Sequence, residues 1–173
     1  MKIIPEIEVT GREHDAITQL RNASFPDHQV ERSYYKRLPH MRALQYGHGK
    51  LIGYMGLDYR VVCVGGTPLK VLGVIDICID KSYQGQGIGS AMLTELSDYA
   101  AAGDVDFIIL MLELDAFYTS NGFNKVCGSS SWLRLHEHQN YGVAFDQLDG
   151  IFVKPMSGKA WAPGQLDWLG YLY

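Results

Sequence analysis

The pattern of hydrophobic and polar positions predicts strands and helices that alternate along the whole chain. Residues 2–9 form an apolar-rich segment that indicates a first strand. Thr10 follows it and Glu13 lies three residues later, which is the spacing of a capping box at a helix N-terminus. The helix that begins there is expected to reach about residue 23, because Ile17 and Leu20 recur on one face.

The next part of the chain predicts an antiparallel meander. Residues 31–38 suggest a second short helix, and residues 41–46 are strand-like. A Gly-His-Gly-Lys turn separates them from a long strand at residues 51–64, and a Gly-Gly-Thr-Pro turn follows. Residues 41–79 are therefore expected to form antiparallel strands joined by tight turns.

A glycine-rich corner interrupts the pattern in the middle of the chain. The apolar run at residues 71–79 predicts a buried strand, and the sequence YQGQGIGS follows at residues 83–90. Apolar residues then recur at helical spacing up to about residue 102. A strand, a glycine corner and a helix N-terminus together favour an anion site, since glycines let the backbone approach a phosphate and the first helical N–H groups lack partners.

Two common phosphate motifs do not fit this corner. A P-loop requires Gly-Lys followed by Ser or Thr, which is absent here. The dinucleotide fingerprint requires a third spaced glycine, whereas Ser90 stands at that position, and no acidic residue follows at the expected distance.

The second half of the chain predicts further strands around one short helix. Residues 106–114 indicate a buried strand, which is expected to run parallel to the strand before the corner because a helical crossover joins them. Residues 115–123 predict a short helix that ends at Asn-Gly. Later strands are expected at residues 132–136 and 150–155, followed by a tail rich in aromatic residues.

Composition adds only broad limits. The chain has 173 residues, of which 47% are hydrophobic and 20% charged, which predicts a single domain over residues 1–173. The net charge is -4, without blocks of like charge, which disfavours nucleic acid and anionic membranes as partners. The sequence shows neither a signal peptide nor an apolar run of membrane-spanning length, so a cytoplasmic location is expected.

Neither a disulfide framework nor a metal site is predicted. Cys63, Cys78 and Cys127 lie far apart and form no Cys-x-x-Cys pair. His136 and His138 would share one strand face, but no further ligand completes a site. We therefore expect three reduced cysteines and no metal.

The corner and a second motif together resemble the GCN5-related N-acetyltransferase (GNAT) superfamily. Gln84 to Gly89 matches the pattern Q/R-x-x-G-x-G/A, and Phe117-Tyr118 followed by Gly122-Phe123 matches F-Y-x-x-x-G-F. The two motifs stand in the family's order, and the resemblance covers residues 71–123. It implies an α+β fold with a mixed, mostly antiparallel sheet of six or seven strands and helices on both faces.

The resemblance also implies acetyl-CoA as cosubstrate and assigns residues to it. The pyrophosphate would be bound mainly by backbone N–H groups of the corner, and the pantetheine arm would pair with the strand before it. The implied cofactor-binding residues are Ile77, Cys78, Ile79, Gln84, Gly85, Gln86, Gly87, Ile88, Gly89 and Ser90.

Two side chains are candidates for proton transfer. The resemblance implies that Tyr118 protonates the leaving thiolate, and a phenol of ordinary pKa is a proton donor at neutral pH. The alternative is that Tyr118 has no catalytic role and only packs beside Phe117 on its helix. Asp76, within an apolar strand where burial raises a carboxyl pKa, is the candidate base, acting through water. Its alternatives are a purely structural role, or Glu113 as the base.

The acceptor is the least determined part of the prediction. The aromatic and acidic residues of the first and last segments suit a small-molecule amine that attacks acetyl-CoA directly in a ternary complex. A covalent route through Cys78 is disfavoured because apolar burial suppresses its thiolate. The length and tail resemble aminoglycoside 2′-N-acetyltransferases. The alternatives are a peptide or protein acceptor and a non-catalytic acyl-CoA-binding module; a homodimer would be common for this superfamily.

Overall fold

The computed structural model describes residues 1–111 and 114–172, which form two compact units. The first unit contains Met1–Asp58 and Val74–Leu96, and the second contains Tyr59–Gly73 and the chain from Ser97 onwards. The α-helices are α1 (Gly11–Ser24), α2 (Ile88–Ala101) and α3 (Asp115–Ser120), and short 3-10 turns are η1 (Glu6–Glu8), η2 (Pro26–His28) and η3 (Lys81–Tyr83). The strands are β1 (Lys2–Pro5), β2 (Met41–Gly47), β3 (Lys50–Val64), β4 (Thr67–Ile79), β5 (Phe107–Met111), β6 (Asn124–His136), β7 (Gln139–Pro155) and β8 (Leu166–Tyr171).

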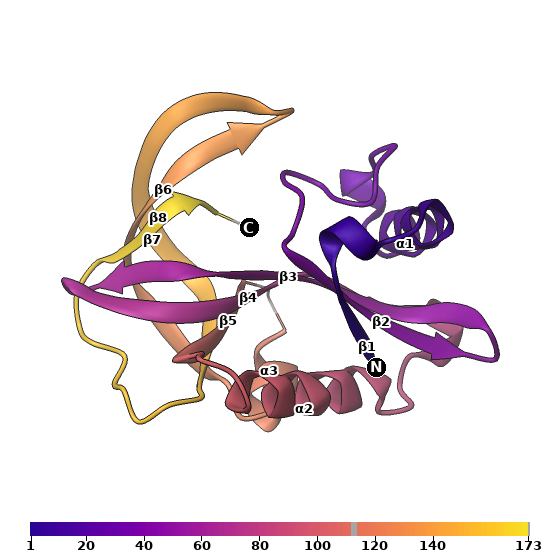
Figure 1. Cartoon of the computed structure of the whole chain (residues 1–173). Coiled ribbons are helices and arrows are strands. Elements are labelled where there is room, and N and C mark those ends of the chain that lie inside the picture. Colours follow the sequence, from indigo (N-terminus) through magenta and orange to yellow (C-terminus); the bar gives the residue numbers. More distant parts are fainter. Residues whose placement is uncertain (112–113, 173) are drawn as a thin grey trace. The chain divides into compact units, whose positions relative to one another are not determined.

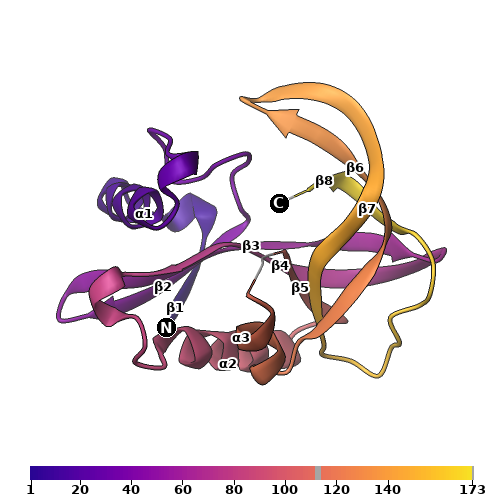
Figure 2. The ribbon, with the colours of Figure 1, turned by 180° about the vertical axis from the view of Figure 1, so that it is seen from behind.

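In the first unit the strand order is β1-β2-β3-β4, and β1–β2 and β2–β3 pair antiparallel. Helix α1 covers one face, where Ile17 and Leu20 pack on side chains from all four strands. The start of α2 lies on the other face, as Figure 2 shows. A Cβ added to Gly53 on β3 would lie only 2.6 Å from Met92 Sδ of α2. Helices therefore cover both faces of these strands, as predicted.

The start of α1 confirms the predicted capping box. The Glu13 backbone N–H donates to Thr10 Oγ1 at 3.3 Å, and the Thr10 N–H donates to Glu13 Oε2 at 2.9 Å. The backbone hydrogen bond from Thr10 is the largest cause that lowers the pKa of Glu13 to about 2. Two backbone donors that the helix cannot satisfy internally are paired in this way.

In the second unit the sheet closes on itself. Its strand order is β3-β4-β5-β7-β6-β8, and β8 pairs again with β3, with Cys63 opposite Asp167. Strands β6 and β7 form a long antiparallel hairpin, visible as the curved pair in Figure 1. The closed sheet surrounds an apolar core of ten buried side chains: Val62, Val64, Leu69, Val71, Phe107, Ile109, Ile151, Val153, Leu166 and Trp168.

The structure corrects several local predictions. The first strand ends at Pro5 because η1 follows, and residues 31–38 form bends rather than a helix. The described residues contain eight strands, since the aromatic tail forms β8 beyond Pro163. His138 lies in the β6–β7 turn with a φ of 60°, so it does not share a strand face with His136.

We expect Thr10→Ala to lower the free energy of unfolding by about 1 kcal/mol, because a helix N-cap side chain is lost. Urea denaturation followed by far-ultraviolet circular dichroism measures this change. Thr119→Ala, at an exposed position of α3, is the control and should change stability by less than about 0.5 kcal/mol. An equal effect of both substitutions would contradict the assignment of the cap.

Candidate functional site

The glycine corner joins β4 to α2 through a short exposed loop. Gly85 and Gly87 have φ angles of 72° and 79°, a left-handed conformation that costs other residues about 1–2 kcal/mol. The Ala91 N–H donates to Gly87 O at 2.9 Å, so the helix begins directly after the second of these glycines. Residues 84–87 are exposed, and the first N–H groups of α2 stand at an accessible helix terminus, which suits an anion.

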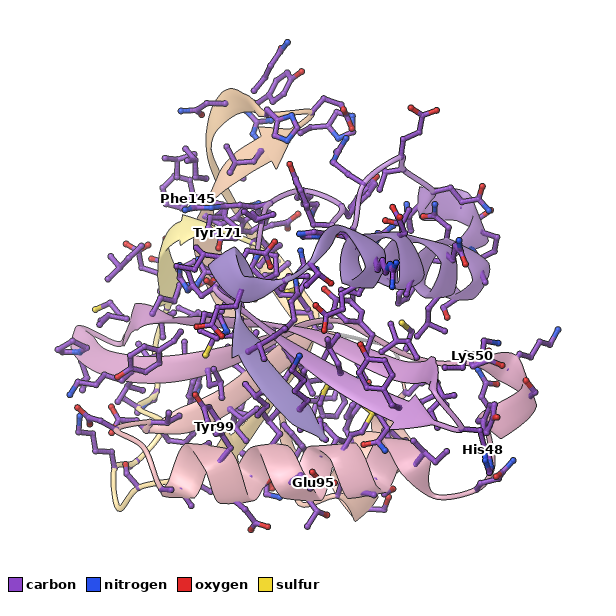
Figure 3. All side chains as sticks on the ribbon, turned by 45° about the vertical axis from the view of Figure 1, so that its right-hand side comes forward. His48, Lys50, Glu95, Tyr99, Phe145 and Tyr171 are labelled. Carbon is purple, nitrogen blue, oxygen red and sulfur yellow. The ribbon has the colours of Figure 1, made fainter. Side chains whose placement is uncertain are left out.

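Side chains before and within the corner fix its shape. Asp80 accepts a hydrogen bond from the Ser82 N–H at 2.9 Å and forms an ion pair with Lys50 at 2.6 Å. Hydrogen bonds from Lys50 and then Ser82 lower the pKa of Asp80 to about 2. Figure 3 labels Lys50, which begins β3, and His48, which lies in the preceding turn.

Both glutamines of the motif support the loop itself. Gln84 Nε2 donates to Ile79 O at 3.0 Å, and Gln86 Nε2 donates to Ser82 O at 3.1 Å. Their side chains thereby hold the loop to the end of β4 and to η3. The candidate donors to a phosphate at this corner are therefore backbone N–H groups.

Asp76 has an unusual backbone conformation in the middle of β4. Its φ angle is 51°, a region that few non-glycine residues adopt, although aspartate tolerates it better than most. Its Oδ2 accepts a hydrogen bond from Arg21 Nε at 2.7 Å. The side chain is 17% exposed, so water can reach it. The sequence did not predict the arginine partner, which lies 55 residues away along the chain.

The end of β4 presents its side chains to two helices. Cys78 is 6% exposed and packs in the apolar cluster beneath α1. Ile79 lies on the opposite face of the sheet, where its side chain and that of Met92 on α2 both approach Gly53. Burial raises the pKa of the Cys78 thiol to about 12. This thiol is therefore protonated at neutral pH, which argues against a covalent cysteine route, as expected. The binding roles of Ile77, Cys78 and Ile79 stay predictions.

Tyr118 belongs to the second unit and is almost completely buried. It lies on α3 with 1% exposure, and its ring contacts those of Phe117, Phe123 and Phe152 at centroid distances of 5.1, 5.9 and 5.5 Å. Burial raises the pKa of its phenol to about 12. The hydroxyl is consequently a neutral proton donor over the physiological range. Glu113, the rival base, lies outside the described residues.

Among residues 1–111 and 114–172, no cluster of three or more His, Cys, Asp or Glu side chains has the arrangement of a metal site. None of the helices described is long and apolar enough to cross a membrane.

Known proteins resemble the central part of this chain in sequence. Residues 42–125 match the family model described as the acetyltransferase (GNAT) domain. N-alpha-acetyltransferase RimI of Mycobacterium tuberculosis is 38% identical over 104 residues, which cover 58% of this chain and 63% of RimI. The chain thus spans less than two thirds of that relative's length.

Solved structures share the fold over nearly the whole chain. The GNAT family N-acetyltransferase YhbS of Escherichia coli, in complex with CoA, has a TM-score of 0.61 and 16% identity over 96% of this chain and 88% of YhbS. An aminoglycoside 6′-N-acetyltransferase complexed with coenzyme A has a TM-score of 0.60 and 13% identity over 92% of this chain and 99% of that enzyme. Residues 42–125 thus resemble the acetyltransferase (GNAT) domain in sequence, and the chain shares the fold of solved GNAT acetyltransferases.

Proposed function

We propose that the protein is an N-acetyltransferase that uses acetyl-CoA as its cosubstrate. The main support for this proposal is the structure of the glycine corner between β4 and α2. It combines the superfamily's motif sequence with two left-handed glycines and an exposed helix N-terminus. It lies within the part of the chain that matches the GNAT domain.

The corner has the chemistry to bind the CoA pyrophosphate. The proposed donors are backbone N–H groups from Gln84 to Ser90, favoured by the positive end of the helix dipole. A Cβ added to Gly85 or Gly87 would meet no protein atom within 4 Å. Glycine is therefore favoured at both positions by the positive φ angle and not by lack of space. The space beside both residues is open for a ligand.

The reaction has three chemical requirements. A neutral amine attacks the thioester carbonyl, and a backbone N–H near Ile77 to Ile79 is proposed to stabilise the oxyanion of the tetrahedral intermediate. The C–S bond then breaks, and Tyr118 is proposed to donate its proton to the departing thiolate. Asp76 is proposed to accept the proton of the amine nitrogen through a water molecule.

Two acceptor classes follow from different observations. A small-molecule amine is the class predicted from the aromatic and acidic residues of the sequence. A peptide α-amino group is favoured by the similarity to RimI, whose name describes an N-alpha-acetyltransferase. The similarity to an aminoglycoside 6′-N-acetyltransferase, at 13% identity, supports only the fold.

The proposal is tested by measuring CoA-thiol release from acetyl-CoA with a panel of acceptors. The panel contains short peptides with free N-termini, aminoglycosides, polyamines and amino acids, and one reaction without acceptor. We expect acceptor-dependent release with one amine class, which then identifies the acceptor. Binding of acetyl-CoA without turnover of any acceptor would favour the acyl-CoA-binding module instead.

Gly87→Ala should weaken CoA binding about 5- to 30-fold, since the ligand would have to force alanine into a left-handed conformation that costs about 1–2 kcal/mol. Isothermal titration calorimetry measures the dissociation constant. Gly158→Ala is the matched control, because Gly158 also has open space around it but no positive φ angle. Unchanged CoA affinity in Gly87→Ala would exclude the corner as the pyrophosphate site.

Tyr118→Phe should lower kcat about 100-fold with little change in CoA affinity, because only the proton donor is removed. The raised pKa of about 12 means that this donor is protonated at neutral pH and is lost only as the pH rises through that value. Tyr118 should therefore cause no alkaline fall in the wild-type rate between pH 7 and 10. Full activity of a variant that combines Tyr118→Phe with Asp76→Asn would refute both roles.

A further inference from the structure

We propose that Arg21 is a positioning residue, which orients the Asp76 carboxylate and connects it to the irregular segment after α1. This inference rests on the proposed function, because it concerns the candidate base of acetyl transfer. All of the residues involved belong to the first unit. None of the sequence motifs includes Arg21.

The ion pair between Arg21 and Asp76 has a directed geometry. Nε of Arg21 donates to Oδ2 of Asp76 at 2.7 Å, where a charged donor meets a charged acceptor. The arginine side chain is only 1% exposed, whereas that of Asp76 is 17% exposed. The cation is thus enclosed by protein, while the carboxylate keeps contact with solvent.

Other contacts immobilise the guanidinium group. Its Nη1 donates to the backbone oxygen of His28 at 2.7 Å. The aromatic rings of Phe25 and Tyr35 lie with their centroids 5.6 and 5.2 Å from its Cζ, within the range of cation–π contacts. These contacts with Phe25, His28 and Tyr35 fix the rotamer of Arg21. The orientation of the Asp76 carboxylate therefore depends on the conformation of residues 25–35.

The neighbourhood of Asp76 contains further titratable groups. Lys36 interacts electrostatically with the carboxylate; burial lowers the pKa of this lysine, and Asp76 opposes the shift. Tyr54 on β3 and Cys78 on β4 also interact electrostatically with Asp76. Both are acids whose pKa is raised by burial, so both are neutral at physiological pH.

Directed contact with Arg21 matters for a base that acts through water. The fixed Nε–Oδ2 contact limits rotation of the carboxylate, so that a water bound to it has a defined position. Replacement of Arg21 should therefore lower the maximal rate without changing the affinity for acetyl-CoA.

The experiment compares Arg21→Gln with Arg21→Lys, using the acceptor that the panel identifies. We expect Arg21→Gln to lower kcat about 10- to 100-fold, because the Asp76 carboxylate loses its directed partner. Arg21→Lys keeps the positive charge but lacks the Nε donor, so it should restore only part of the lost kcat. The KM for acetyl-CoA should stay unchanged in both variants.

Controls separate positioning from folding. Arg12→Gln removes the same charge from an exposed position of the same helix and should leave the rate unchanged. In an Asp76→Asn background, Arg21→Gln should cause no further loss of rate. Thermal unfolding of each variant shows whether the fold persists at the assay temperature.

Failure of this inference can be distinguished from failure of the proposed function. An active wild type whose Arg21→Gln variant keeps the wild-type kcat would overturn the positioning role, even if that variant were less stable. An inactive wild type would refute the proposed function and with it the catalytic meaning of the pair.

Discussion

The first unit depends on the burial of a permanent positive charge. Arg21 cannot lose its proton in a protein, and its side chain is 1% exposed, so its charge must be compensated locally. Asp76 supplies the counter-charge, and a backbone carbonyl with two aromatic rings completes the surroundings. Because breaking a buried ion pair leaves an uncompensated charge, α1, residues 25–35 and the middle of β4 are constrained together.

A second buried arginine repeats this arrangement. Arg42 on β2 is fully buried, and its guanidinium donates to both carboxylate oxygens of Glu6, at 2.5 and 3.1 Å. It also donates to the backbone oxygen of Ser33 at 2.7 Å. Residues 25–40 contain no long helix or strand. Arg21 and Arg42 donate hydrogen bonds to backbone oxygens of that segment. An irregular segment can in this way have a defined conformation beside a candidate site.

The glycine corner shows how a short motif can specify a binding site with few side chains. Lys50 pairs with Asp80, and the two glutamines donate to backbone oxygens of Ile79 and Ser82. The donors proposed for a ligand are therefore backbone N–H groups. Such a site recognises the charge and shape of a phosphate and is indifferent to the acceptor. The motif therefore supports the proposal that CoA is the ligand and carries no information about the acceptor class.

Features that depend on neighbouring residues could be predicted from the amino-acid sequence. The capping box at Thr10, the turns of the meander, the corner and its helix follow from local spacing, and all are present in the structure. Local pattern failed at residues 31–38 and in the tail, where tertiary contacts decide the conformation. Only the folded chain brings Arg21 to Asp76 and gives Asp76 its positive φ angle, because sequence spacing carries no signal for a contact between residues 55 positions apart.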